Sequence, residues 1–419
     1  MKMANLDLKM KPLNQPLTLP NGIVIPNRLA KAATSETLAT YSNNPNEKHV
    51  RLYRRWAASG IGMIITGNIM IDRNALGEAG NVVIEDERDF AILQQWASSV
   101  TKQGSQLWAQ LNHPGKQSPK GLNKRNISAS AVPFGKEMRS LFDTPREATN
   151  EEILDIIQRF GRSAAICKRA GFSGVEIHAA HGYLINQFLS PLHNLRNDDW
   201  GGTPEKRRKF LLEVYMEIRK QVGEEFPIAI KLNSADFQKG GFTEEDSLET
   251  IKALASAGID LIEISGGTYE SGVAKAPPKA STLAREAFFI DFAKKVRAHV
   301  NTPLMLTGGF RTSEGMNQAL EAEAFDLVGI ARLMAIDPDA PKYLLAGTDS
   351  NQMVRPIKTG IKKIDGLGIM EVLWYTQQLN RIAKGKNPKP NESGLWAFIK
   401  SVLRSSWGTY ATQRTRAKL

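Results

Sequence analysis

The chain of 419 residues is 42% hydrophobic and 23% charged, a composition that supplies a large core. It holds no apolar run near the roughly 18–20 residues of a membrane-spanning helix, and its start, MKMANLDLKMKP, lacks the pattern of a signal peptide, so we expect a cytoplasmic protein. The single cysteine, Cys167, excludes an internal disulfide and an iron–sulfur cluster held by about four thiolates.

The net charge of +12 belongs mostly to the end of the chain. Residues 350–419 contain thirteen Lys and Arg against three Asp and Glu, so the preceding residues are close to neutral. We therefore expect no nucleic-acid partner for the main domain. Contact of the basic tail with a membrane surface or with nucleic acid stays open as an alternative.

Eight short apolar runs alternate with amphipathic segments that have the spacing of helices. The runs are Leu29–Ala33, Met63–Thr66, Gln106–Leu111, Val175–His178, Ile228–Leu232, Leu261–Ser265, Leu304–Thr307 and Leu327–Ile330. The predicted helices are Glu47–Ser59, Phe90–Gln103, Glu151–Ala170, Pro204–Val222, Glu244–Ala257, Glu286–Val300 and Ser313–Ala322, with capping boxes at Thr149–Glu152 and Thr243–Asp246. Apolar strands that alternate with helices indicate a parallel sheet covered on both faces. Eight units favour closure into a single (β/α)8 TIM barrel, and the lack of GxGxxG after the first strand counts against an open dinucleotide-binding sheet.

Three segments lie outside this alternation. Residues Pro12–Asn27 are predicted to form a hairpin that plugs the N-terminal mouth of the barrel. The long loop from Asn112 to Thr149 has the length of a lid or a substrate wall. Beyond Pro341, Met370–Lys384 and Leu395–Trp407 have the pattern of amphipathic helices. We expect a barrel over residues 1–345, followed by a basic helical C-terminal extension over 346–419 that is packed on the barrel or tethered to it.

Small and polar residues stand at the carboxyl ends of the predicted strands, where the loops of an α/β barrel converge on one mouth. They are Ser35, Gly67, Gln110, His178 with His181, Lys231, Ser265 with Gly266, Gly308 with Gly309, and Arg332. The last two ends combine glycine amides with a cation, as in the phosphate site of barrel enzymes. A tight Gly-Gly turn and a surface ion pair of Arg332 are the alternative interpretation.

The densest motif is HAAHGY, which contains His178, His181 and Tyr183. Two imidazoles can donate to one carbonyl oxygen, and a phenol with a pKa near about 10 is a neutral proton donor at neutral pH. A zinc pair or structural histidines are the alternatives, and no third ligand of suitable spacing is present.

The segments HAAHGYLINQFLSPLHNLRNDDWGG, WAQLNHPGKQ and NRLAKAATSE resemble the old yellow enzyme family of NADH:flavin oxidoreductases, a likeness that runs from about residue 16 to 341. The resemblance implies a stand-alone barrel that holds FMN non-covalently, with NADH or NADPH as reductant. It implies that His178 and His181 hold the carbonyl oxygen of the substrate and that Tyr183 donates the proton. The residues that it places against FMN are Ala32, Ala33, Thr34, Ser35, Gly67, Gln110, Lys231, Gly308, Gly309, Ala331 and Arg332. Ser35 stands where many relatives carry Thr or Cys, which we expect to retune the flavin potential. Lys231 stands where many carry Arg, so it keeps the charge but loses the planar guanidinium.

The resulting hypothesis is an FMN-dependent ene-reductase that acts on a small α,β-unsaturated carbonyl compound. The alternatives are an FMN enzyme with a quinone, nitro compound or amine as acceptor, and a lyase or isomerase that uses Lys231 as a Schiff-base amine. A further alternative is a binding module that acts through the basic tail. The sequence leaves open whether the protein forms a homo-oligomer.

Overall fold

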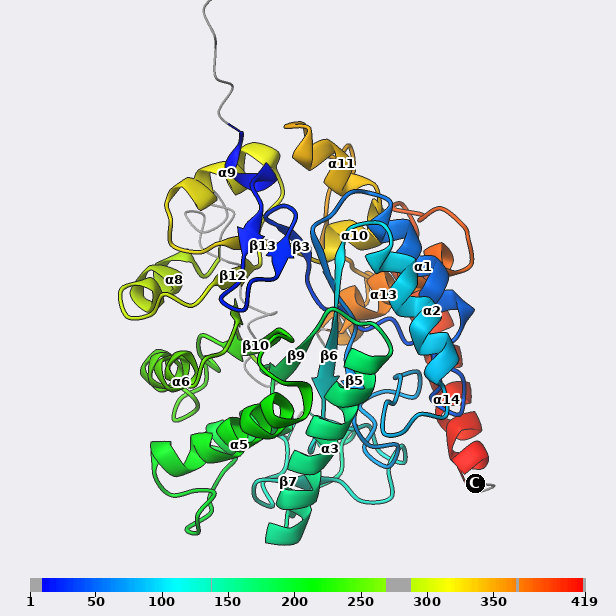
Figure 1. Cartoon of the computed structure of the whole chain (residues 1–419). Helices are drawn as coiled ribbons and strands as arrows, with labels where there is room; N and C mark the ends of the chain where they lie inside the picture. The colour runs from blue at the N-terminus through cyan, green and yellow to red at the C-terminus, as the bar shows by residue number, and fades with distance from the viewer. Residues whose placement is uncertain (1–9, 137, 269–287, 367–368, 417–419) are drawn as a thin grey trace, which may run out of the picture.

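The computed structural model describes residues 10–136, 138–268, 288–366 and 369–416 (Figure 1). Its main sheet is a closed ring of eight parallel strands in the order β4-β3-β13-β12-β11-β10-β9-β6, and the pairing of β4 with β6 closes it. The strands are β3 Leu29–Lys31, β4 Met63–Ile65, β6 Gln106–Asn112, β9 Gly174–Ala179, β10 Ile228–Asn233, β11 Leu261–Ser265, β12 Leu304–Thr307 and β13 Leu327–Ile330. The predicted TIM barrel is confirmed.

Helices lie around the ring of strands, as Figure 1 shows. They are α1 Glu47–Ala57, α2 Phe90–Thr101, α3 Asn150–Arg169, α4 Leu184–Leu189, α5 Pro204–Val222, α6 Glu244–Ser256, α8 Ile290–Arg297, α9 Ser313–Glu321, α10 Arg332–Ile336 and α11 Ala340–Leu345. Both predicted capping boxes are present, at the starts of α3 and α6. The expected helix Glu286–Val300 begins outside the described residues, and its described part, α8, spans Ile290–Arg297.

The N-terminal plug forms as predicted. Strands β1 (Leu17–Thr18) and β2 (Val24–Ile25) pair antiparallel after the short 3₁₀ helix η1 (Pro12–Asn14). Leu17, Leu19 and Ile25 are buried in one cluster with inward-facing side chains of the strands. Apolar packing therefore fills the amino end of the barrel, and polar side chains are left to its carboxyl end.

Two short pairings lie beside the carboxyl end of the barrel. Strand β5 (Ile69–Met70) pairs with the end of β6. Strands β7 (Ile127–Ser128) and β8 (Arg146–Glu147) pair in parallel within the long loop that follows β6. That loop therefore carries structure of its own.

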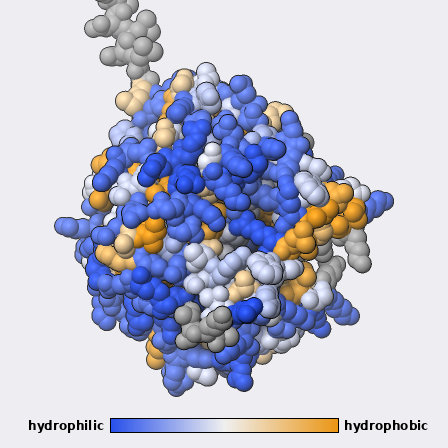
Figure 2. All heavy atoms as spheres, turned by 90° about the vertical axis from the view of Figure 1, so that its right-hand side faces the viewer, coloured by the Kyte–Doolittle hydropathy of each residue, from blue (hydrophilic) through white to orange (hydrophobic). Residues whose placement is uncertain are grey.

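The C-terminal extension contains α12 (Lys362–Asp365), α13 (Met370–Ala383) and α14 (Gly394–Arg416). Helix α13 contacts α1, α10 and α14, and its Trp374 is buried with Nε1 donating to the carbonyl of Glu392. Helix α14 exposes Trp396 and Leu403. Figure 2 shows apolar patches that interrupt a mostly hydrophilic surface. In the described ranges, no helix combines the length and hydropathy required to cross a membrane.

Candidate active site at the carboxyl ends of the strands

Four polar side chains from neighbouring strands form two hydrogen-bonded pairs inside the barrel. Gln110 Nε2 of β6 donates to Glu176 Oε1 of β9 over 2.7 Å. Lys231 Nζ of β10 lies 2.9 Å from Glu263 Oε1 of β11, and the two side chains are only 5% and 0% exposed. In register, Gln110 lies beside Glu176, and Lys231 lies beside both Glu263 and His178. Because alternate residues of a strand point to the same face, Glu176 and His178 share one face of β9.

Burial sets the charge of this group. It raises the pKa of the Glu176 carboxyl well above its usual range, and repulsion from Glu263 adds to the effect. Burial alone would also raise the pKa of Glu263, but the nearby Lys231 ammonium outweighs it and holds that pKa below its usual value. The pKa of Lys231 is raised, because its attraction to Glu263 and Glu176 exceeds the cost of burying its charge. The group thus holds a buried ion pair beside a neutral carboxyl.

The rings of His178, His181 and Tyr183 meet at the end of β9. The His178 and His181 ring centroids are 5.3 Å apart, and those of His178 and Tyr183 are 4.7 Å apart, both in edge-to-face arrangements. His181 has φ 59° and is followed by Gly182 with φ 80°, a left-handed turn that brings Tyr183 back over the strand end. The sequence prediction that these three side chains share one site is consistent with this geometry.

Both imidazoles are held neutral. Burial lowers the pKa of His178 well below its usual value, and His181 and the Lys231 ammonium add to this effect. Burial, with a smaller contribution from Lys231, lowers the pKa of His181 to about 3. The Nδ1 atom of His178 accepts from the backbone N–H of Ala180 over 3.3 Å. A neutral ring that accepts at Nδ1 carries its proton on Nε2, so His178 can donate from that atom. His181 Nε2 lies 2.9 Å from the Ser265 hydroxyl.

The segment after β3 lines the next sector of the mouth. Ala32 N–H donates to the carbonyl of Ile330 on β13, and Ser35 Oγ donates to Glu78 Oε2. The Thr34 hydroxyl is buried and has no hydrogen-bond partner among the residues that the structure describes. Gly67 lies against this segment: a Cβ there would come 2.6 Å from the carbonyl oxygen of Thr34. The close approach explains why a glycine ends β4.

Gly308 and Gly309 follow β12 with φ values of 128° and 93°. Positive φ at two successive residues leaves their backbone open to close approach by a ligand. Arg332 follows Ala331 at the start of α10 and lies 2.6 Å from Glu371 of α13. The guanidinium is 43% exposed, so part of it remains open to solvent.

Sequence reasoning missed the buried acids Glu176 and Glu263. Each is a single charged residue inside an apolar strand, in GVEIH and LIEIS, and that pattern was the available signal. In the described part of the chain, no group of three or more His, Cys, Asp or Glu side chains is placed to hold a metal ion. The mouth therefore offers neutral imidazole donors, the buried cation Lys231 with Lys31 close by, and glycine backbone.

The sequence matches the family described as NADH:flavin oxidoreductase / NADH oxidase over residues 12–351. It is 38% identical over 373 residues to the NADH-dependent flavin oxidoreductase iliE of Neonectria sp. (strain DH2), covering 83% of this chain and 48% of that protein. It is 35% identical to the NADH-dependent flavin oxidoreductase iccE of Talaromyces variabilis, covering 89% of this chain and 98% of the relative. The chain thus spans about half of the first relative and nearly all of the second.

The fold is also similar to a solved structure, that of the old yellow enzyme homologue from Zymomonas mobilis. The TM-score is 0.70 at 23% identity, and the match covers 82% of this chain and 95% of the other. At this identity the likeness bears on the fold alone, and it agrees with the closed barrel described above.

Proposed function

The chain belongs to the NADH:flavin oxidoreductase / NADH oxidase family, and from this premise we propose that it reduces an activated carbon–carbon double bond conjugated to a carbonyl group. It is an FMN-dependent oxidoreductase of the old yellow enzyme type, with NADH or NADPH as reductant. The observation that carries the proposal is the meeting of two neutral imidazoles and a phenol at the barrel mouth.

The residues at the mouth fit FMN. The buried hydroxyl of Thr34 has no partner within the described protein, and the backbone at Gly308 and Gly309 is open for a phosphate. In the proposal the ring is held by Ala32, Ala33, Thr34, Ser35, Gly67, Gln110 and Lys231, and the phosphate by Gly308, Gly309, Ala331 and Arg332. When bound, FMN supplies the hydride that the β-carbon of the substrate receives.

His178 and His181 hold the carbonyl oxygen of the substrate in this proposal. A neutral imidazole donates a hydrogen bond to the carbonyl oxygen without transferring its proton. The two hydrogen bonds polarise the carbonyl and make the β-carbon electrophilic. By analogy with oxyanion holes, each oriented donor lowers the barrier by roughly 2.7–4 kcal/mol. Tyr183 delivers the proton to the α-carbon.

Lys231 contributes a fixed positive charge near the pyrimidine part of the ring. Its pairing with Glu263 disfavours a Schiff-base lyase, because that chemistry needs a neutral amine and the ion pair keeps the pKa of Lys231 raised. A quinone, nitro compound or amine remains the alternative class of acceptor for the same site, and a panel of acceptors offered to the reduced protein decides among them.

The substitution Tyr183→Phe tests the proton donor. We expect the variant to bind flavin and to be reduced by NADH or NADPH at the wild-type rate, while its reoxidation by an enone slows by about 10²–10⁴-fold. Rapid-mixing measurements of the two half-reactions separate these effects, with the exposed Tyr343 changed to Phe as the control. Equal slowing of both half-reactions would exclude Tyr183 as the donor, since only reoxidation consumes the proton.

A further inference from the structure

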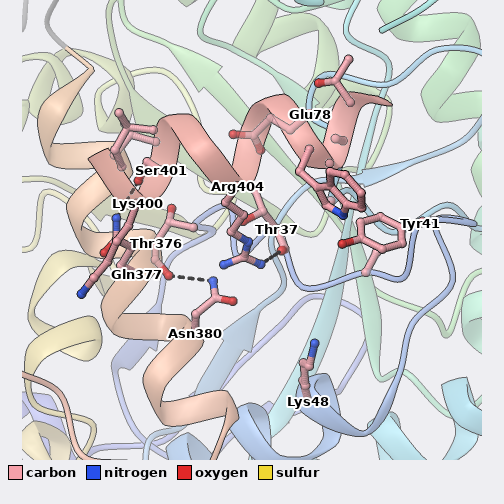
Figure 3. Close-up of a pocket in the computed structure, with 18 of the residues that line it drawn as sticks. Thr37, Tyr41, Lys48, Glu78, Thr376, Gln377, Asn380, Lys400, Ser401 and Arg404 are labelled. Carbon is pink, nitrogen blue, oxygen red and sulfur yellow. Dashed lines mark hydrogen bonds between the residues drawn. The ribbon is translucent and has the colours of Figure 1, made fainter. Parts of the chain in front are cut away.

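A pocket of about 890 Å³ lies between the C-terminal extension and the loops that follow β3 and β5. Helix α14 covers one side, α13 forms another, and Thr37 to Tyr41 with Glu78 to Gly80 form the floor (Figure 3). This volume falls in the range of sites for small organic ligands, about 300–1,000 Å³. The pocket is therefore large enough for a nucleotide-sized molecule.

The pocket is strongly cationic. Its basic lining residues are Lys48, Arg381, Lys384, Lys386, Lys400 and Arg404, and its acidic ones are Glu78 and Glu392. Glu392 pairs with Lys400 of the same lining and so offsets one of its cations, and Glu78 accepts from the Ser35 hydroxyl. Burial also raises the pKa of Glu78 and so favours its neutral form. Apart from the Glu392–Lys400 pair, the lining keeps Lys48, Arg381, Lys384, Lys386 and Arg404 against Glu78, so it carries excess positive charge.

Three cations of the lining, Arg404, Lys48 and Lys384, are exposed side chains. Arg404 points from α14 into the pocket, and its Nη2 donates to the carbonyl of Thr37 over 2.6 Å (Figure 3). In the described ranges of the chain, no Asp or Glu lies within ion-pair distance of these three cations. They also repel one another: burial, Arg404 and Lys384 all lower the pKa of Lys48. These three exposed like charges give this face of the pocket a positive potential that attracts anions.

The remaining lining is apolar and aromatic. Tyr41 and Trp407 border the pocket together with Leu122, Val372 and Leu373. Exposed aromatic faces beside cations suit a flat base that carries phosphate, because the base stacks while the guanidinium binds oxygen. An inorganic anion would use only the cationic half of this surface.

The pocket also adjoins the flavin-lining segment. Thr376, which lines it, donates to the backbone carbonyl of Ser35, and Asn380 donates to that of Glu36. A ligand in the pocket is thus separated from the proposed ring site by one short stretch of backbone.

We propose that this pocket binds the adenosine phosphate portion of a molecule whose other end reacts at the barrel mouth. Two sources share that chemistry, the nicotinamide dinucleotide reductant and a coenzyme A thioester. The reaction of the other end at the mouth rests on the proposed function, but binding of an adenosine phosphate in the pocket does not. Arg404 and Lys48 bind the phosphate, and Tyr41 and Trp407 flank the base.

The test uses dead-end ligands on the full-length, flavin-loaded protein, so that no turnover is needed. Calorimetric titrations compare adenosine 2′,5′-bisphosphate, ADP-ribose, adenosine 3′,5′-bisphosphate and inorganic pyrophosphate. We expect binding of at least one adenosine compound, about tenfold weaker in Arg404→Gln because a charge-assisted hydrogen bond is lost. Lys48→Gln should also weaken it, and Arg404→Lys should keep part of the affinity. Arg414→Gln, on the exposed part of the same helix, serves as the matched control and should bind like wild type.

The pattern of affinities identifies the source. Tightest binding of the 2′,5′-bisphosphate or of ADP-ribose assigns the pocket to NADPH or NADH, and tightest binding of the 3′,5′-bisphosphate assigns it to coenzyme A. The proposal is overturned if no adenosine compound binds, if Arg404→Gln binds as tightly as Arg414→Gln, or if pyrophosphate binds as tightly as the adenosine compounds. A protein that binds these probes but reduces no enone would refute the proposed function and leave the pocket assignment standing.

Discussion

Replacing Lys231 by Met should destabilise the barrel far more than the loss of an ordinary ion pair. Lys231 Nζ and Glu263 Oε1 are 2.9 Å apart, and their side chains are 5% and 0% exposed. With an effective dielectric constant of about 20, their gross attraction is about 6 kcal/mol. Part of this offsets desolvation, and removal of one partner from a buried pair costs about 3–5 kcal/mol, because a buried charge is left alone.

Urea unfolding of the flavin-free proteins measures this cost without the contribution of the ligand. The double variant Lys231→Met, Glu263→Met removes both charges and should be more stable than the single variant. Lys252→Met is the control, because Lys252 and Glu249 are 2.7 Å apart but 42% and 47% exposed, and such pairs contribute about 0–1 kcal/mol. Equal stability of the single and double variants would refute the reasoning.

The contribution of the Lys231–Glu263 pair to stability depends on pH. In the wild type the pKa of Glu263 is held below its usual value, so the pair stabilises the protein above the unfolded pKa and loses this contribution as the pH falls. In Lys231→Met the same carboxyl is buried without its cation, so its pKa should rise, and the variant gains relative stability on acidification. The difference between the two proteins should therefore be largest at neutral pH. It should shrink as the pH falls from the raised pKa of Glu263 in the variant to its lowered pKa in the wild type.

The remaining predictions concern the mouth itself. The double change His178→Ala, His181→Ala should weaken binding of a phenolic ligand, measured by flavin absorbance, while His299→Ala, an exposed control, should not. The pKa of His178 is lowered by burial, and that of His181 is lowered to about 3. Wild-type affinity for a non-ionising phenol should therefore not change with pH down to about pH 5. A loss of affinity near pH 6.5 would contradict neutral imidazoles. Gly67→Ala should lower flavin content and cost about 1–3 kcal/mol of stability, because its Cβ would lie 2.6 Å from the carbonyl oxygen of Thr34; Gly77→Ala, with its nearest atom at 3.5 Å, is the control.

Much of the barrel follows from local sequence patterns. Runs such as Leu261–Ser265 and Leu304–Thr307 coincide with β11 and β12, because a strand buried on both faces reads as a continuous apolar run. The capping boxes at Thr149 and Thr243 set helix starts by hydrogen bonds between residues three apart, so they are visible in the sequence.

Other elements depend on partners that are distant in the chain. Helix α4, Leu184–Leu189, was missed because all its residues are buried and leave no amphipathic period. Arg332 was assigned to a phosphate, and only the folded chain shows that Glu371 lies 2.6 Å from it. Strands β7 and β8 pair across a loop that the sequence indicated only by its length.

The sequence likewise predicted only part of the candidate site. His178, His181 and Tyr183 lie within six residues, so a single motif was enough to group them. The pairs Gln110–Glu176 and Lys231–Glu263 join residues 66 and 32 positions apart, and barrel closure alone brings them together. Arg404 and Lys48 come from opposite ends of the chain, which is why the pocket under α14 has no sequence signature.

The most direct test of the account follows the two hydrogens added to an enone. The protein is reduced anaerobically with deuterium-labelled NADH or NADPH, mixed with a cyclic enone in ordinary water, and the product is examined by nuclear magnetic resonance. The account predicts that deuterium from the reductant appears at the β-carbon and a solvent-derived hydrogen at the α-carbon. Label at the α-carbon, or no reoxidation of the flavin by the enone, would contradict it.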